Sequence, residues 1–419
     1  MITTLGTHAT TGPTWGIGYQ RTTDRAFFSA FQRRRSAFGS AGVGGVYVVP
    51  NASTCASCTP VAVNFGSIVG ASVGTDTHTI GSEDFTTRPS LTPATNIAVD
   101  AGGYTNSTAV DPANPYSQVG KIGWGDIDVS EDQTRLYGVS LNDRSLYAID
   151  ITAAAPGSFT AVDLNGAAAG NGVLVPDPGC ANGVARPFAI GMNSGRVYVG
   201  GVCTAENAGG TSANLSAYVY SFDPATNTFS ATPELTLPLN YARGCADAPT
   251  GTAYINGATC PNTPLYGSGQ TLTGGEGTWQ PWIDKIPVPP HTGAAGTGWP
   301  NGYRTGGNMM HSQPILSDID FVSPTGDMVL GFRDRFADQL GNEDLGPENS
   351  VRRNADGVTN AGSPVFSDGF YTAFPAGDVL RAARSGSTWA LESNGAGTGF
   401  ANTFTNTAVN PAGTYNAGA

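Results

Sequence analysis

The chain has 419 residues, of which 12% are charged, and its formal net charge is -12 at pH 7. This length suits one large all-β domain or two or three ordinary domains, so core size is not limiting. The acidic balance argues against nucleic acid and anionic lipid as partners, because both require a basic surface. The 58 glycines and 28 prolines are interleaved with apolar β-forming residues. This composition is typical of a folded, turn-rich protein.

A recurring group of strands organises the chain, and almost no helical period is present. Each copy contains a strand, a short polar turn with Asp or Gly, a second apolar strand, and a third strand rich in aromatic and β-branched residues. The first copy reads TWGIGYQ-RTTD-RAFFSAF and then GGVYVV. The four copies occupy residues 14–68, 125–164, 186–236 and 316–393. Since four-stranded antiparallel units repeated around an axis make a β-propeller, the sequence predicts an all-β propeller with long loop insertions. A β-sandwich or stacked β-domains is the alternative.

The predicted propeller covers residues 14–395, with an insertion at 237–312. Residues 1–13 and 396–419 are rich in Thr, Asn, Gly and Ala, and we expect them to be extended. Either segment could add as a strand to an exposed sheet edge of a neighbouring molecule. The sequence contains no apolar run long enough to span a membrane and no signal peptide. Because strand-like residues begin by Trp15, we expect that a leader has been removed or that a longer chain has been excerpted.

Six cysteines in an acidic chain indicate an oxidising compartment. Their spacing is most simply explained by three local disulfides. These are Cys55 with Cys58, Cys180 with Cys203, and Cys245 with Cys260. A thioredoxin-like motif would need a helix after its first cysteine, and no helical period surrounds the CASC sequence. A zinc site would need a second close cysteine pair.

Two strands carry paired carboxylates. In GDIDVS the period of two places Asp126 and Asp128 on one face of a strand, and the related LSDIDF places Asp318 and Asp320 in the same way. Buried carboxylates must be satisfied by arginine, by backbone donors or by a cation. We favour structural pairing, because a feature that recurs between repeats usually serves the architecture. A calcium site and a catalytic pair remain open.

A second group of oxygen donors surrounds a glycine in RDRFADQLGNEDLGPEN. The donors are Asp338, Asn342, Glu343 and Asp344. Calcium binds six to eight such oxygens from a flexible loop, so this segment is a second calcium candidate. The alternative is a polar loop in which Arg333 and Arg335 form ion pairs. The sequence requires no cofactor, and calcium is the one that these patterns suggest.

Aromatic side chains gather among Gly and Pro in the predicted insertion. They are Trp279, Trp282, Trp299 and Tyr303. Such a loop could stack on sugar rings or form a protein contact. It could equally be a lid that covers the apolar end of a blade.

Common catalytic motifs are absent from the sequence. The four histidines have no zinc-binding spacing, and there is no nucleophile elbow or phosphate-binding loop. A glycosidase needs only two well-placed acids, so carbohydrate chemistry remains compatible with the chain.

Several motifs carry a resemblance in their order and spacing. They are GPTWGIGYQRTTDRAFFSAF, VGKIGWGDIDVSEDQTRLYGVSL, RPFAIGMNSGRVYVGGV, QPILSDIDF and MVLGFRDRFADQ. Together they resemble the N-terminal region of large bacterial surface proteins that carry SdrD B-like repeat domains, over most of residues 10–395. The resemblance implies a secreted, cell-surface, propeller-like region with no assigned catalytic activity.

We therefore expect a non-catalytic extracellular structural or adhesive protein, displayed at the bacterial surface or assembled into a fibre by strand addition. Its expected partners are other copies of itself, other surface proteins or glycans, with no nucleic acid and no insertion into a membrane. The alternative function is a secreted carbohydrate-binding or carbohydrate-active propeller protein.

Overall fold

The computed structural model describes the segments that carry most of the predicted strands. They are residues 4–34, 36–56, 58–76, 115–166, 170–241, 279–284, 312–340, 377–386 and 388–391. It also describes five short strands: β15 (Thr263–Leu265), β16 (Gln270–Leu272), β17 (Asn308–Met309), β20 (Asp344–Leu345) and β21 (Phe370–Ala373).

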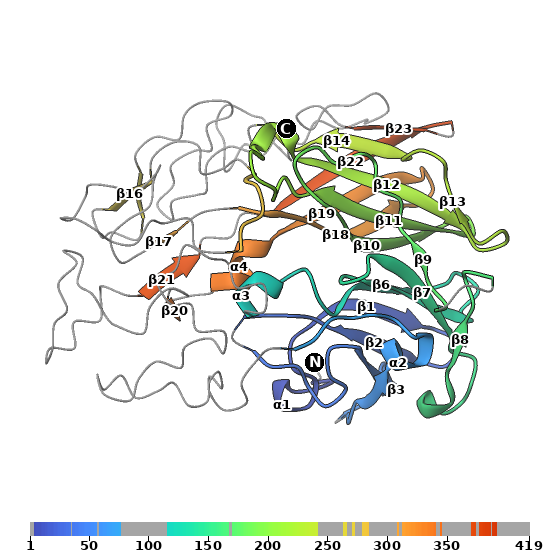
Figure 1. Ribbon diagram of the computed structural model, residues 1–419. Coiled ribbons are helices and arrows are strands. Elements are labelled where there is room, and N and C mark those ends of the chain that lie inside the picture. Colours follow the sequence, from blue (N-terminus) through green and yellow to red (C-terminus); the bar gives the residue numbers. More distant parts are fainter. Residues whose placement is uncertain are drawn as a thin grey trace, which may run out of the picture.

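Four antiparallel sheets form a four-bladed β-propeller (Figure 1). Blade 1 contains β1 (Thr14–Gln20), β2 (Arg25–Ala30), β3 (Gly45–Pro50) and β4 (Val61–Asn64). Blade 2 contains β5 (Trp124–Val129), β6 (Arg135–Ser140), β7 (Ser145–Asp150) and β8 (Thr160–Val162), and β9 (Val173–Leu174) also pairs with β7. Blade 3 contains β10 (Ala185–Asn193), β11 (Arg196–Cys203), β12 (Ser216–Asp223) and β13 (Thr228–Phe229), and β14 (Leu235–Pro238) also pairs with β12. Blade 4 contains β18 (Pro314–Val322), β19 (Asp327–Asp334), β22 (Asp378–Ser385) and β23 (Thr388–Leu391). The predicted propeller is confirmed.

The helices are short and lie between blades or at their ends. They are α1 (His8–Thr11), α2 (Phe65–Val69), α3 (Pro115–Gln118), α4 (Arg335–Leu340) and the 3₁₀ turns η2 (Pro156–Ser158) and η3 (Ser212–Asn214). The α1 turn corrects the expectation of a wholly extended segment at 1–13. Thr7 and Thr10 form a capping box, and Gly12 ends the turn with a φ of 61°. These local hydrogen bonds stabilise a helical turn that the pattern of apolar residues does not predict.

A β-bulge interrupts the first strand of every blade. The register shifts between Thr14 and Ile17 in β1, between Trp124 and Ile127 in β5, between Pro187 and Ala189 in β10, and between Leu316 and Asp318 in β18. A bulge bends its strand and changes the direction of the side chains that follow. Asp126 and Asp318 therefore occupy equivalent positions, at the bulge in the first strand of their blades.

The hydrophobic core lies between blades. One cluster joins blades 1 and 2, with Phe27, Trp124 and Leu136 among its members. A second joins blades 2 and 3, and a third joins blades 3 and 4 around Leu316 and Met328. Burial of apolar area between neighbouring sheets is thus what holds the blades in sequence around the ring.

Candidate functional site

The four carboxylates of the two DID motifs form the candidate site. Strands β5 and β18 contact each other although they belong to blades 2 and 4. Asp126 is 6% exposed as a residue. Its carboxylate accepts the backbone N–H of Ile127 at 2.9 Å and that of Ile190 in β10 at 3.1 Å. Asp128 accepts the N–H of Val129 at 2.7 Å. Backbone N–H groups therefore satisfy the buried Asp126 carboxylate. Backbone donors were one of the three alternatives that the sequence left open, beside arginine and a cation.

Burial and like charges change the acidity of these groups. Burial, followed by the negative charge of Asp318, raises the pKa of Asp126 well above its usual value. Burial raises the pKa of Asp128 to about 7, against the N–H bond from Val129, and Asp318 and Asp320 add to the increase. Desolvation by the surrounding protein also raises the pKa of Asp318, helped by Asp320. The pKa values of Asp126, Asp128 and Asp318 are therefore shifted upward from the usual carboxyl value.

A metal ion is not supported by a ligand cluster in the part of the chain that the structure describes. There, no three His, Cys, Asp or Glu side chains are grouped so that they could hold one. Calcium at Asp126, Asp128, Asp318 and Asp320 stays a prediction.

Asp338, the first donor of the second calcium candidate, lies in α4 and is ion-paired. Its side chain is fully buried, and its Oδ1 accepts from Arg33 Nε at 2.7 Å and from Arg333. Two adjacent guanidinium groups repel a divalent cation, so an ion pair replaces calcium as the interpretation of Asp338. Asn342 and the side chain of Asp344 lie outside the described residues.

Two of the four predicted aromatic ligand-binding residues are buried. Trp279 and Trp282 belong to the core between blades 3 and 4. The Trp282 indole N–H donates to the carbonyl oxygen of Pro314 at 2.7 Å. A buried indole has no free face for a sugar ring, so these two residues fit the lid interpretation and not the stacking one. Trp299 and Tyr303 lie outside the described residues.

A partly buried ion network lies beside Trp282. It contains the ion pair that the sequence analysis offered for Arg335, but its other members were not expected from the sequence. Lys121 Nζ lies 2.7 Å from Asp284 and 3.0 Å from Glu206, Arg186 lies 2.7 Å from Glu206, and Arg335 lies 3.0 Å from Asp284. Burial acts to raise the pKa of Glu206 and of Asp284, but the neighbouring cations outweigh it and both pKa values lie below the usual range. Its members come from distant segments, so no local spacing signals the network.

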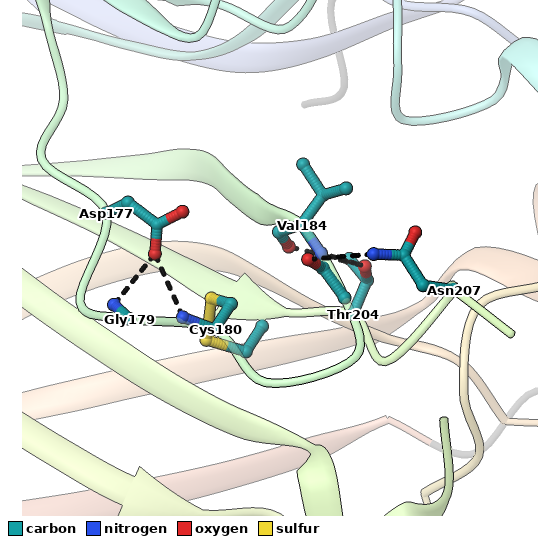
Figure 2. Close-up of a disulfide and its surroundings, with 8 residues drawn as sticks. Asp177, Gly179, Cys180, Val184, Thr204 and Asn207 are labelled. Atoms are coloured by element: carbon teal, nitrogen blue, oxygen red, sulfur yellow. Dashed lines mark hydrogen bonds between the residues drawn. A yellow bond between two sulfur atoms is a disulfide. The ribbon is translucent and has the colours of Figure 1, made fainter. Parts of the chain in front are cut away.

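Two of the three predicted disulfides are present. Cys55 pairs with Cys58, and Cys180 pairs with Cys203. Figure 2 shows the second bridge beside Asp177, whose carboxylate accepts the N–H groups of Gly179 at 2.8 Å and Cys180 at 3.0 Å. This bridge ties the segment before β10 to the end of β11. Cys245 and Cys260 lie outside the described residues.

The fold and its cross-links define the class: an all-β, four-bladed propeller with disulfides. Within its described segments, the chain has no helix with the length and apolar character needed to cross a membrane. No family model matches the sequence. Three curated proteins of Dictyostelium discoideum are similar to parts of it.

Colossin-A is 34% identical over 154 residues, which are 37% of this chain and 1% of that protein. Colossin-D is 25% identical over 246 residues, or 58% of this chain and 21% of that protein. Colossin-B is 28% identical over 153 residues, or 36% of this chain and 3% of that protein. The chain thus matches only a small share of the length of these relatives.

Distant similarity to solved structures is also found. A levansucrase from B. megaterium has a TM-score of 0.28 and 9% identity, with 91% of this chain and 85% of that chain covered. An inulosucrase from Halalkalicoccus jeotgali has a TM-score of 0.27 and 11% identity, with 92% and 88% covered. A periplasmic gluconolactonase from Pseudomonas aeruginosa has a TM-score of 0.23 and 11% identity, with 54% and 58% covered.

Proposed function

We propose that this chain is a non-catalytic extracellular structural or adhesive module, displayed at a bacterial surface or assembled into fibres by strand addition. Disulfides support an oxidising, extracellular setting. The resemblance to N-terminal regions of bacterial surface proteins points the same way. The segment matched in Colossin-D occupies 21% of that protein, as a module in a longer chain would.

The observation that carries strand addition is the edge strand of blade 1. Strand β4 ends the sheet, and among the described strands it pairs with β3 alone. Three of its four residues are exposed, including Val61 at 39%. An exposed edge with apolar side chains is a template for a strand from another molecule. The sequence predicts two donor segments, 1–13 and 396–419. The proposal takes the second, because the first contains the helical turn α1, and residues 396–419 lie outside the described residues.

Two changes test this assembly. We expect Val61→Lys, and separately deletion of residues 396–419, to abolish fibres or oligomers in electron microscopy and size-exclusion chromatography. The isolated domain should melt as before, because Val61 is exposed and charge at an edge blocks pairing without disturbing the sheet. Leu174→Lys is the matched control, since Leu174 is also an exposed apolar strand residue, at 61%. Unchanged assembly in both the Val61 variant and the deletion would refute the proposal.

The second candidate function is a secreted carbohydrate-binding or carbohydrate-active protein, with glycans as partners. The raised pKa of Asp128, about 7, favours it, because a general acid needs a carboxyl that stays protonated near neutral pH. It predicts binding or turnover on a panel of polysaccharides that is lost in Asp128→Asn while the fold is kept. Activity equal to that of the unchanged protein would exclude Asp128 from such a site.

A further inference from the structure

The Cys55–Cys58 disulfide lies in the connection between β3 and β4, where residues 51–60 read NASTCASCTP. Both cysteines are partly exposed, and their neighbours Thr54 and Ala56 are exposed. None of the residues in this connection carries a charged side chain. A thiolate that approaches the bridge from solvent therefore meets small, uncharged groups of the connection.

Hydrogen bonds hold this connection in place without the disulfide. The carboxylate of Asp24 accepts the N–H of Ser53 at 3.0 Å and the Ser53 hydroxyl at 2.8 Å. The backbone carbonyl oxygen of Asp24 accepts the N–H of Ala52 at 2.9 Å. After Cys58 the chain enters β4, which pairs with β3 from Val61 onward. Opening the disulfide therefore leaves the connection attached to blade 1 at both ends.

The Cys180–Cys203 disulfide has different surroundings (Figure 2). Cys203 is 3% exposed and packs in the core between blades 2 and 3, although Cys180 is only partly buried. In thiol exchange a thiolate attacks one sulfur while the other sulfur leaves as a thiolate. The core covers Cys203, and attack on Cys180 would release the Cys203 thiolate into an apolar cluster that does not solvate it. The fold therefore protects this bridge and leaves the other one accessible.

We propose that the Cys55–Cys58 disulfide is a thiol-exchange site, at which the thiol of a partner attaches to this chain through a mixed disulfide. The thiolate of the partner forms a bond with the sulfur of one cysteine, the Cys55–Cys58 bond breaks, and the other cysteine leaves as a thiolate that takes a proton from water. One disulfide replaces another, so the step needs no separate oxidant or reductant. It does not depend on strand addition at β4, since it needs only an accessible sulfur.

The attachment is reversible, because the released thiol stays close to the mixed disulfide. Cys55 and Cys58 are three positions apart, so the free thiolate of one can attack the mixed disulfide on the other and restore the original bridge. A helix N-terminus stabilises the thiolate in redox enzymes, and none occurs within residues 51–56 or 58–60. We therefore expect the exchange rate of an accessible disulfide and not that of an oxidoreductase.

Peptide mapping after brief treatment with reduced glutathione tests the site on the full, folded chain. Free thiols are alkylated at each time point, and tryptic cleavage after Lys121 places the two bridges in different peptides. Cys55 and Cys58 should become glutathionylated or alkylated at least about tenfold faster than Cys180 and Cys203. In urea that unfolds the chain this advantage should become much smaller, because it comes from the burial of Cys203.

Two single-cysteine variants test the return step. Cys55→Ser and Cys58→Ser each leave one thiol, which oxidised glutathione converts into a mixed disulfide. These adducts should persist after glutathione is removed, whereas an adduct of the wild-type chain should be lost as the bridge forms again. A second arm replaces reduced glutathione by a folded protein with one exposed cysteine. A disulfide-linked complex in that arm extends the partner class to proteins, and its absence restricts the class to small thiols.

Two results would overturn the proposal. The first is modification of Cys55 and Cys58 in the folded chain no faster than that of Cys180 and Cys203, which would mean that the fold does not leave the first bridge available. The second is loss of the near-ultraviolet circular dichroism signal when only the Cys55–Cys58 bridge is opened, which would make that bridge a structural one. Neither readout requires fibres or oligomers, so this proposal fails independently of the proposed function.

Discussion

The indole N–H of Trp15 donates to the carbonyl oxygen of Ser317 at 3.2 Å, across 302 positions of the sequence. Trp15 lies in β1 and Ser317 in β18, so this bond joins the first strand of blade 1 to the first strand of blade 4. The Arg333 guanidinium lies 4.0 Å from the centre of the same indole ring. Blades 1 and 4 are therefore connected through one aromatic side chain, which completes the ring of described blades.

Replacing Trp15 by Phe removes the donor and keeps an aromatic ring for Arg333. We expect the free energy of unfolding in urea to decrease by about 0.5–1.5 kcal/mol, the net value of one hydrogen bond. Hydrogen exchange should increase in both β1 and β18, because the bond that connects the two strands is lost.

Trp389→Phe is the matched control. The Trp389 indole N–H donates to Gly326 at 3.0 Å, inside blade 4. Its loss should increase exchange in blade 4 and leave β1 unchanged. Equal exchange in β1 for the Trp15 variant and the wild-type chain would mean that the bond does not couple the two blades.

The blade repeat could be predicted from sequence because its signals are local. Alternating apolar residues and turn residues recur in every copy, and the first strands begin at Thr14, Trp124, Ala185 and Pro314, within two residues of the predicted starts. The same period correctly placed the two carboxylates of each DID motif on a single strand. It could not show that the two strands meet, because that contact depends on the arrangement of blades around the axis.

Other parts of the site have little local signal. Asp338 was a calcium candidate, with an ion pair of Arg333 as the alternative; Arg333 lies five positions away and does pair with it, whereas its second partner Arg33 lies 305 positions away. For Trp279 and Trp282 the sequence left open a ligand-binding loop and a lid over a blade, and only the structure shows that they lie in the core of blades 3 and 4. Burial and long-range pairing are properties of the assembled propeller.

The buried Arg335 should be much more important for stability than a surface arginine. Its guanidinium donates to the carbonyl oxygens of Val119 and Ile283, each at 2.7 Å, and to Asp284 at 3.0 Å. Arg335→Met removes the donor to Val119 and one of the donors to Ile283 and Asp284, which keep Gln339 and Lys121. Because buried charge and carbonyl groups lose their partner, we expect a loss of about 3–5 kcal/mol in the free energy of unfolding. Urea denaturation of the purified variant measures it.

Arg196→Met provides the comparison for Arg335. Arg196 pairs with Asp223 at 3.3 Å, and both side chains are partly exposed. A surface pair of this kind contributes at most about 1 kcal/mol. Similar losses for the two variants would contradict the structural role assigned to the buried Arg335.

The two disulfides should differ in their effect on stability. Cys180 and Cys203 are 23 positions apart, whereas Cys55 and Cys58 are 3 apart. On the loop-closure model the longer loop predicts a loss of about 3 kcal/mol when both cysteines become serine, against about 2 kcal/mol for the shorter one. Urea denaturation of the two double variants checks the order, and a larger loss for the Cys55 and Cys58 pair would contradict it.

Close approach between blades depends on one glycine in the first strand of each of blades 1, 2 and 3. A Cβ added at Gly16 would lie 2.5 Å from the backbone nitrogen of Ile127. A Cβ at Gly125 would lie 2.7 Å from the carbonyl oxygen of Phe188. A Cβ at Gly191 would lie 2.5 Å from the carbonyl oxygen of Ile319. Each contact is with the first strand of the next blade. Glycine at these points lets two backbones approach, which is a signal that the sequence contains in TWGIGYQ, GWGDIDV and AIGMN.

Gly16→Ala should therefore separate blades 1 and 2. The obstructing atom is backbone and cannot rotate away, so we expect a loss of about 1–3 kcal/mol, the usual cost of overpacking. Gly157→Ala is the control, because a Cβ at Gly157 meets no atom within 4 Å. Urea denaturation should place the Gly157 variant within about 0.5 kcal/mol of the wild-type chain, as for surface changes generally. If Gly16→Ala is equally mild, the first strands of blades 1 and 2 do not pack as closely as the structure has them.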